Sequence, residues 1–158
     1  APWHSEGMSD DELPSPEHTA PPGVSDAVVE AVGKLTEALE TCERARGHLY
    51  SFHQLTGSAD IELGEAVQAL RDAGQTEAVE RIERELLGRN VLAGRWTFQV
   101  VEEYDDDYWS LFRELERDVR DRLVGGRRHL YEARLKQKER TAGLPGHEAT
   151  PDDVEPER

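Results

Sequence analysis

Apolar residues recur at intervals of three and four over most of the central part of the chain, which is the spacing of a helix that buries one face. The first such segment follows Ser25, a residue type that commonly caps a helix N-terminus. It is interrupted by "TGS" at 56–58, so the pattern predicts a first helix from Ser25 to about Leu55. Its apolar face comprises Val28, Val32, Leu35, Leu39, Cys42 and Leu49.

The same reasoning predicts further helices and leaves no room for a sheet. Capping residues precede three more periodic segments, and "GRN" and Gly125-Gly126 provide stops. No alternation typical of a strand continues for more than a few residues. We therefore expect an all-α protein, a four-helix up-down bundle with a short fifth helix. The predicted later helices are 58–73 capped by Ser58, one from Thr76 to the "GRN" stop, Asn90 to about Leu123, and 127–140.

Both ends of the chain differ in composition from this helical middle. Residues 1–24 contain five of the eight prolines, and residues 141–158 contain five acids with Arg158 as the only Lys or Arg. Such segments cannot bury enough apolar surface to order themselves. We predict disordered acidic arms at 1–24 and 141–158, which flank one helical domain at 25–140.

Charge and cysteine content exclude several classes of function. The net charge of −15 argues against a nucleic-acid partner, which usually requires a basic surface. Cys42 is the only cysteine, so neither an intramolecular disulfide nor a Cys-rich zinc site is expected. No apolar segment has the length of a signal core or a membrane span, so we expect a cytoplasmic protein without a membrane partner. No phosphate loop or zinc motif is present, so we expect no cofactor, no metal and no catalytic residue.

The stretch "VVEEYDDDYWSLF", 100–112, concentrates five carboxylates among aromatic residues. On a helical wheel Glu102 and Asp106 face water, while Glu103 and Asp107 lie at the solvent boundary. Asp105 differs because it falls on an apolar flank of the same helix. Since burial of a bare carboxylate is costly, Asp105 is expected to be paired or protonated.

The apolar face of this fourth helix is expected to be centred on Tyr104. The neighbouring Glu116 and Arg120 are four residues apart and are expected to form a solvated pair on the outer surface. The side chains predicted to accompany Tyr104 on the apolar face are Val100, Val101, Tyr108, Leu111, Leu115 and Val119.

Polar residues interrupt the first helix at the height where Asp105 is expected. If the helices alternate up and down, Arg46 lies level with 101–105, and an Arg46–Asp105 pair follows. If the second and third helices instead form one rod, the first and fourth run parallel and the pairing fails. The predicted cluster, a ligand site or a structural one, comprises Glu43, Arg46, Tyr50, His53, Tyr104, Asp105 and Tyr108.

These residues permit two readings of function. In the first, the cluster is a structural salt bridge, and the protein is a non-enzymatic interaction or scaffolding module that forms a homodimer or binds another protein. Trp96 and Trp109 are then candidate partner anchors, unless they pack at the edge of the core against the fifth helix. In the alternative, the bundle binds a small molecule or a metal between its first and fourth helices. The Glu-x-x-His motifs of carboxylate-bridged di-metal bundles are absent.

Two segments, "ARGHLYSFHQLTG" and "GRNVLAGRWTFQVVEEYDDDYW", resemble parts of uncharacterised all-α hypothetical proteins of high-GC actinobacteria. The resemblance covers roughly residues 25–140. It implies a source and carries no activity, cofactor or site residue.

Overall fold

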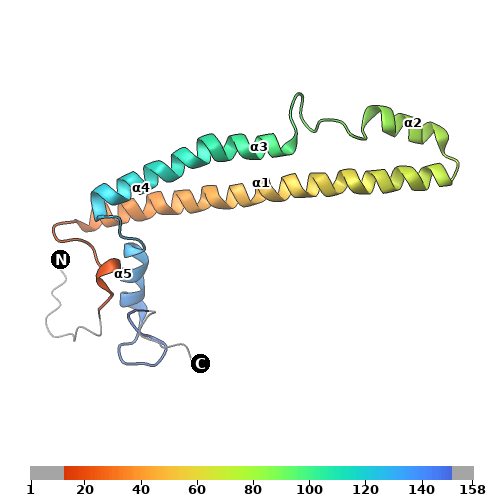
Figure 1. The fold of residues 1–158 in the computed structure, drawn as a ribbon. Coiled ribbons are helices and arrows are strands. Elements are labelled where there is room, and N and C mark those ends of the chain that lie inside the picture. The colour runs from red at the N-terminus through yellow and green to blue at the C-terminus, as the bar shows by residue number, and fades with distance from the viewer. Residues whose placement is uncertain (1–12, 151–158) are drawn as a thin grey trace. The chain divides into compact units, whose positions relative to one another are not determined.

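The computed structural model describes residues 13–150, and its regular elements in that range are helical, apart from an isolated bridge between Leu92 and Arg95 (Figure 1). The prediction of an all-α protein is confirmed. The finer prediction of a four-helix up-down bundle is not confirmed. In chain order the elements are η2 (Pro16–His18), α1 (Asp26–Asp72), α2 (Thr76–Glu85), α3 (Thr97–Tyr104), η3 (Asp105–Trp109), α4 (Ser110–Val124) and α5 (Leu130–Glu139).

The predicted break after Leu55 is wrong, because α1 continues through "TGS" to Asp72. The Thr56 hydroxyl donates to the Phe52 carbonyl at 2.7 Å, within the helix. One interior glycine costs only about 1 kcal/mol relative to alanine, and packing beyond the break outweighs it. The buried and partly buried side chains continue at helical spacing across the break: Cys42, Arg46, Leu49, His53, Thr56, Leu63, Val67 and Leu70.

The predicted helix start at Asn90 is also wrong. Asn90 Oδ1 accepts a hydrogen bond from Trp96 Nε1 at 2.8 Å, so this side chain holds a loop instead of capping a helix. The helix begins at Thr97, where the Trp96 backbone N–H donates to Gln99 Oε1 at 2.8 Å. Local side-chain bonds to the loop thus compete successfully with helix formation over 90–96.

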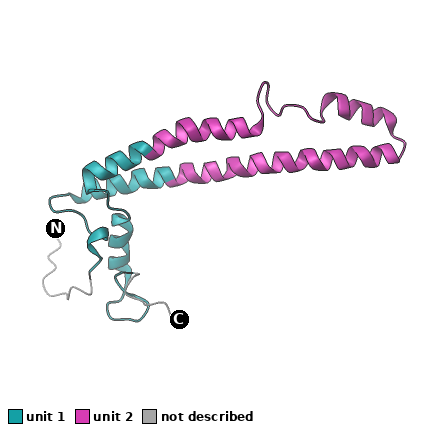
Figure 2. Cartoon of the chain, viewed as in Figure 1, with its two compact units in different colours: residues 1–39, 114–158 teal, residues 40–113 magenta. Residues whose placement is uncertain are grey.

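The chain divides into two compact units, shown in Figure 2. Unit 1 comprises residues 1–39 and 114–158, and unit 2 comprises residues 40–113. Of the two predicted arms, 1–12 and 151–158 lie outside the described residues. Within 13–24, Ala20 and Val24 pack against the core of unit 1. That core consists of Val29, Val32, Val124 and Leu130.

Unit 1 also buries an ion pair that the sequence places on the surface. Glu116 and Arg120 are 5% and 7% exposed, and Arg120 Nε lies 3.0 Å from Glu116 Oε1. The Thr36 hydroxyl donates to the same carboxylate at 3.1 Å, and Arg120 Nη1 donates to the Gly126 carbonyl at 2.7 Å. The expectation of a solvated pair is therefore wrong, and both buried charges have partners.

In unit 2, residues 40–72 of α1 lie beside α2 and then beside α3 and η3, which run in the opposite direction. His53 bonds Thr97, and Arg46 bonds Asp105. The earlier residue of α1 therefore contacts the later residue of the returning arm, as in an antiparallel pair. The parallel alternative is therefore wrong, although the predicted first and second helices do form one rod. Near the end of α1, Arg71 pairs with Glu83 of α2.

Candidate functional site

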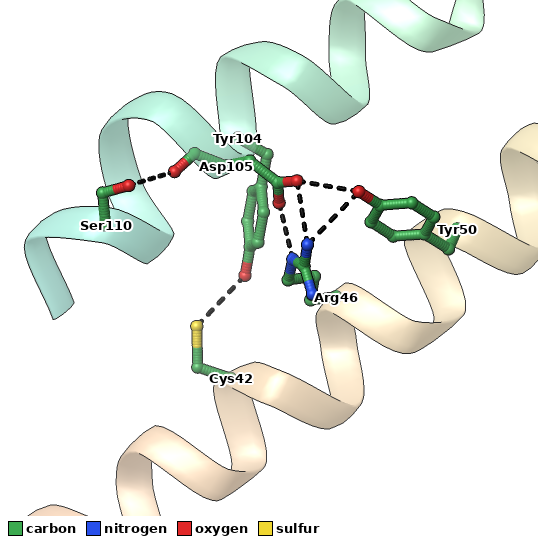
Figure 3. A network of polar contacts seen from close by, with 6 residues as sticks. All are labelled: Cys42, Arg46, Tyr50, Tyr104, Asp105 and Ser110. Atoms are coloured by element: carbon green, nitrogen blue, oxygen red, sulfur yellow. Dashed lines mark hydrogen bonds and ion pairs between the residues drawn. The ribbon is translucent and has the colours of Figure 1, made fainter. Parts of the chain in front are cut away.

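The returning arm of unit 2 contains a π-helical turn, η3, between α3 and α4. A π-turn has about one residue more than an α-turn, so it rotates every following side chain by roughly 100°. Ser110 follows this turn, and its hydroxyl donates to the Asp105 carbonyl (Figure 3). The turn brings both Asp105 and Trp109 toward α1.

This rotation corrects the predicted apolar face of the fourth helix. Tyr108, Leu111 and Leu115 were expected inside but are 56%, 50% and 53% exposed. One position further along, Trp109 and Phe112 are partly buried instead. The wheel assumed a regular α-helix, and a single π-turn is enough to exchange the two sets.

The predicted pair between Arg46 and Asp105 is present (Figure 3). Arg46 Nε donates to Asp105 Oδ1 at 2.6 Å and Nη2 donates to Oδ2 at 3.0 Å, a bidentate arrangement. The two side chains are 27% and 17% exposed. A bidentate guanidinium–carboxylate contact fixes orientation as well as charge, so it defines how α1 and η3 meet.

Aromatic side chains surround this pair. The Tyr50 hydroxyl donates to Asp105 Oδ2 at 2.9 Å and accepts from Arg46 Nη2 at 3.2 Å. The guanidinium carbon of Arg46 lies 3.9 Å from the ring centroid of Trp109 and 4.8 Å from that of Tyr50. Arg113 lies 4.6 Å from the same Trp109 ring. Cation–π contacts therefore supplement the ion pair.

The pKa shifts in this cluster follow from these bonds. Hydrogen bonding from Arg46, reinforced by Tyr50 and by the guanidinium charge, lowers the pKa of Asp105 below its ordinary 3.8. The bond to Asp105 raises the pKa of Arg46, and the Tyr50 hydroxyl bond to Asp105 raises the Tyr50 pKa. Each group is thus held in the protonation state it has near neutral pH, which is the opposite of what a general acid or base requires.

One contact beside the cluster was missed by sequence reasoning. Cys42 Sγ lies 3.2 Å from the Tyr104 hydroxyl, and this bond, with burial, raises the pKa of Tyr104 to about 12. Cys42 was assigned to the apolar face, where it does lie buried. Its hydroxyl partner was not identifiable from α1 alone, because it comes from the other arm.

The remaining predicted residues are distributed differently. Glu43 is exposed, and His53 Nδ1 bonds the Thr97 hydroxyl at 2.7 Å instead of joining Arg46. The Tyr108 ring packs beside Tyr104 and Phe112, with centroids 5.7 and 6.1 Å away. Only part of the predicted cluster therefore assembles: Arg46, Tyr50 and Asp105, with Trp109 added.

The two tryptophans predicted as partner anchors differ in exposure. Trp96 is 60% exposed, whereas Trp109 lies partly buried beneath Arg46 and Arg113. Trp109 Nε1 is buried without a hydrogen-bond partner among the described residues. Trp109 therefore contributes to the polar cluster and is not an open anchor.

A second feature of unit 2 is an apolar flank, defined here by Ala45, Phe52, Leu55, Tyr108 and Leu111, all of which are exposed. Viewed along α1, Tyr50 lies about 40° to one side of Arg46, while Phe52 lies about 120° to the other. In antiparallel helix pairs, residues on the same side of the contact line border one another. The Tyr50–Asp105 bond marks one side, so Phe52 and Tyr108 share the opposite side.

Comparisons with known proteins give no family for this chain: no family model, no curated protein and no solved structure matches it. Between residues 13 and 150, no three His, Cys, Asp or Glu side chains form a group that could hold a metal ion. Across the same described range, no helix combines the length and apolar character needed to cross a membrane.

Proposed function

We propose that this protein is a non-enzymatic interaction module that binds a helical partner through the apolar flank of unit 2. The observation that carries the proposal is the imbalance of hydrophobic side chains in residues 40–113. Only Cys42, Val67, Val79 and Val101 are buried there. The exposed large hydrophobics of the same segment are Tyr50, Phe52, Leu55, Ile61, Leu86, Val91, Leu92, Trp96, Phe98, Tyr108 and Leu111.

The imbalance has a simple physical cause. Two helices that meet along one line bury one stripe of each helix and leave the rest in water. The flank adds further exposed apolar side chains beside that stripe, and a gathering of exposed apolar side chains on one side marks an interaction site. A partner helix laid along Phe52 and Leu55 would cover these side chains and extend the hairpin into a helical bundle.

The polar cluster supports this function as a scaffold. Arg46 and Asp105 neutralise each other, and Tyr50 bonds both. An ion pair of this type fixes the register of the two helices, which keeps the residues of the flank at constant positions. The small-molecule alternative is less well supported, because an anionic ligand at Arg46 would have to displace the Asp105 carboxylate.

The test uses a photocrosslinking residue placed at two matched positions of α1. Leu55 and Ile61 are 67% and 68% exposed, but they lie about 120° apart around the helix, and only Leu55 belongs to the flank. In cells that express the chain, benzoylphenylalanine at position 55 should give discrete adducts that position 61 does not. Equal adduct yield from both positions, or no adduct from either, would contradict the proposal.

A further inference from the structure

We infer that the helical partner is a second copy of this chain, packed with its α1 antiparallel to the first about a two-fold axis near Phe52 and Leu55. The inference rests on the proposed function, because it names the occupant of the same flank. Its evidence is the order of residues along the exposed side of α1, the placement of charge, and the area available.

The exposed flank of α1 has the spacing of a coiled-coil contact line. Successive members are separated by alternating steps of four and three residues, the repeat that keeps one line facing a partner helix. All of them are exposed, the two large apolar members lie in the middle, and alanines occur on both sides of them. The line reads Thr41, Ala45, His48, Phe52, Leu55, Ala59, Glu62, Ala66 and Ala69.

Antiparallel pairing gives each member of this line a suitable neighbour. Phe52 then meets Leu55 of the second copy, and the symmetric contact places four large apolar side chains at the axis. Moving outward, His48 meets Ala59 of the second copy. Alanines on both sides of the axis allow the helix backbones to approach closely while Phe52 and Leu55 fill the centre.

The charge pattern distinguishes antiparallel from parallel pairing. Parallel pairing would place Glu62 against Glu62 and His48 against His48, in a chain whose net charge is already −15. Antiparallel pairing places Glu62 against Ala45 of the second copy, level with its Tyr108. The Tyr108 hydroxyl is a donor suited to that carboxylate, so the one acid on the line gains a partner.

The area is sufficient for a stable contact. From Thr41 to Ala69 the helix rises about 42 Å, and a strip one helix diameter wide covers about 400 Å². Tyr108 and Leu111 extend the flank onto the returning arm, and each is at least half exposed. With this second row the buried area approaches the roughly 800 Å² per partner that is usual for specific complexes.

The first measurement is the mass of the full chain by sedimentation equilibrium over a range of concentrations. The chain mass is 17.8 kDa, and we expect twice that value. Leu55→Glu should weaken the dimer at least about thirtyfold, as expected for a central hot spot, while the matched control Ile61→Glu should leave it unchanged. Equal effects of the two variants would overturn the inference, and so would a wild-type monomer at every concentration.

Cysteine crosslinking then tests the direction of pairing, in a Cys42→Ser background. Mixing the Ala45→Cys and Glu62→Cys chains should give a disulfide-linked heterodimer. Ala45→Cys alone should not crosslink, because its two copies lie about 25 Å apart along the axis. Efficient self-crosslinking of Ala45→Cys would show parallel pairing and overturn the inference. If the wild-type chain is a monomer but Leu55 photoadducts contain a different protein, the second copy is excluded and the proposed function stands.

Discussion

The two units of this chain differ in how far they bury apolar side chains and ion pairs. In unit 1, α1, α4, α5 and the segment just before α1 surround a small apolar cluster. The side chains of the Arg120–Glu116 pair there are only 9% and 7% exposed. In unit 2, helices meet along a single line, and the Arg46–Asp105 pair keeps 27% and 17%. Aliphatic side chains such as Leu55 and Ile61 remain in water there.

The difference shows that burial here depends on how many elements converge, more than on how hydrophobic each helix is. A residue is covered on all sides only where a third or fourth segment crosses the helix pair. Unit 1 supplies those segments from its own sequence. Unit 2 supplies two sides of a core, so the remaining side is available to a partner.

The largest effect is expected at the buried ion pair of unit 1. Arg120→Ala leaves Glu116 buried and charged and removes the donor to the Gly126 carbonyl, which should lower the free energy of unfolding by about 3 kcal/mol. Urea unfolding followed by circular dichroism measures this loss. The control is Arg122→Ala, whose pair with Asp118 is 75% and 48% exposed and should matter by less than about 0.5 kcal/mol. Similar losses for both variants would show that burial does not distinguish the two pairs.

A smaller, pH-dependent effect is expected at the cluster of unit 2. Asp105→Asn removes the charge that Arg46 binds, and we expect a loss of about 1–2 kcal/mol at pH 7. Because folding lowers the Asp105 pKa, its contribution is complete above the ordinary value of 3.8 and is lost as pH falls through the lowered value. Urea titrations at several pH values should therefore show the wild-type and variant stabilities converging below about pH 4. A constant difference down to pH 2 would contradict this assignment.

The smallest effect is expected from deletion of Asp106 in η3. Removing one residue converts the π-turn into an α-turn and leaves Trp109 and Phe112 facing α1, so stability should change by less than about 1 kcal/mol. The control is deletion of Asp118 from the regular helix α4, which rotates Val124 out of the unit 1 core by about 100° and should cost several kcal/mol. Thermal unfolding measures both. A large loss on deleting Asp106 would mean that the π-turn itself is required.

Much of the polar cluster was predictable from the sequence, because its candidate residues stand out within each helix taken separately. The burial cost of a carboxylate singled out Asp105, and the interrupted apolar face of the first helix singled out Arg46 and Tyr50. The position of Trp109, the Tyr104 partner of Cys42 and the burial of the Glu116–Arg120 pair were not predicted, for one shared reason. Their surroundings depend on side chains or turns that come from the opposite arm, and a wheel drawn for one helix contains none of these.

The sequence by itself determined that the chain is helical and that Ser25 begins the first long helix, where its hydroxyl accepts from the Val28 N–H at 3.2 Å. It also identified Arg46 and Asp105 as candidate partners, paired only if the first and fourth helices run antiparallel. These follow from periodicity, capping and the cost of an unpaired charge, which act over a few residues. Only the tertiary structure decided that α1 continues through Gly57, that η3 exchanges Leu111 for Phe112 at the contact line, and that Phe52 and Leu55 stay exposed. Each depends on which segments pack together, and the energy of a glycine or a π-turn is small enough for packing to override.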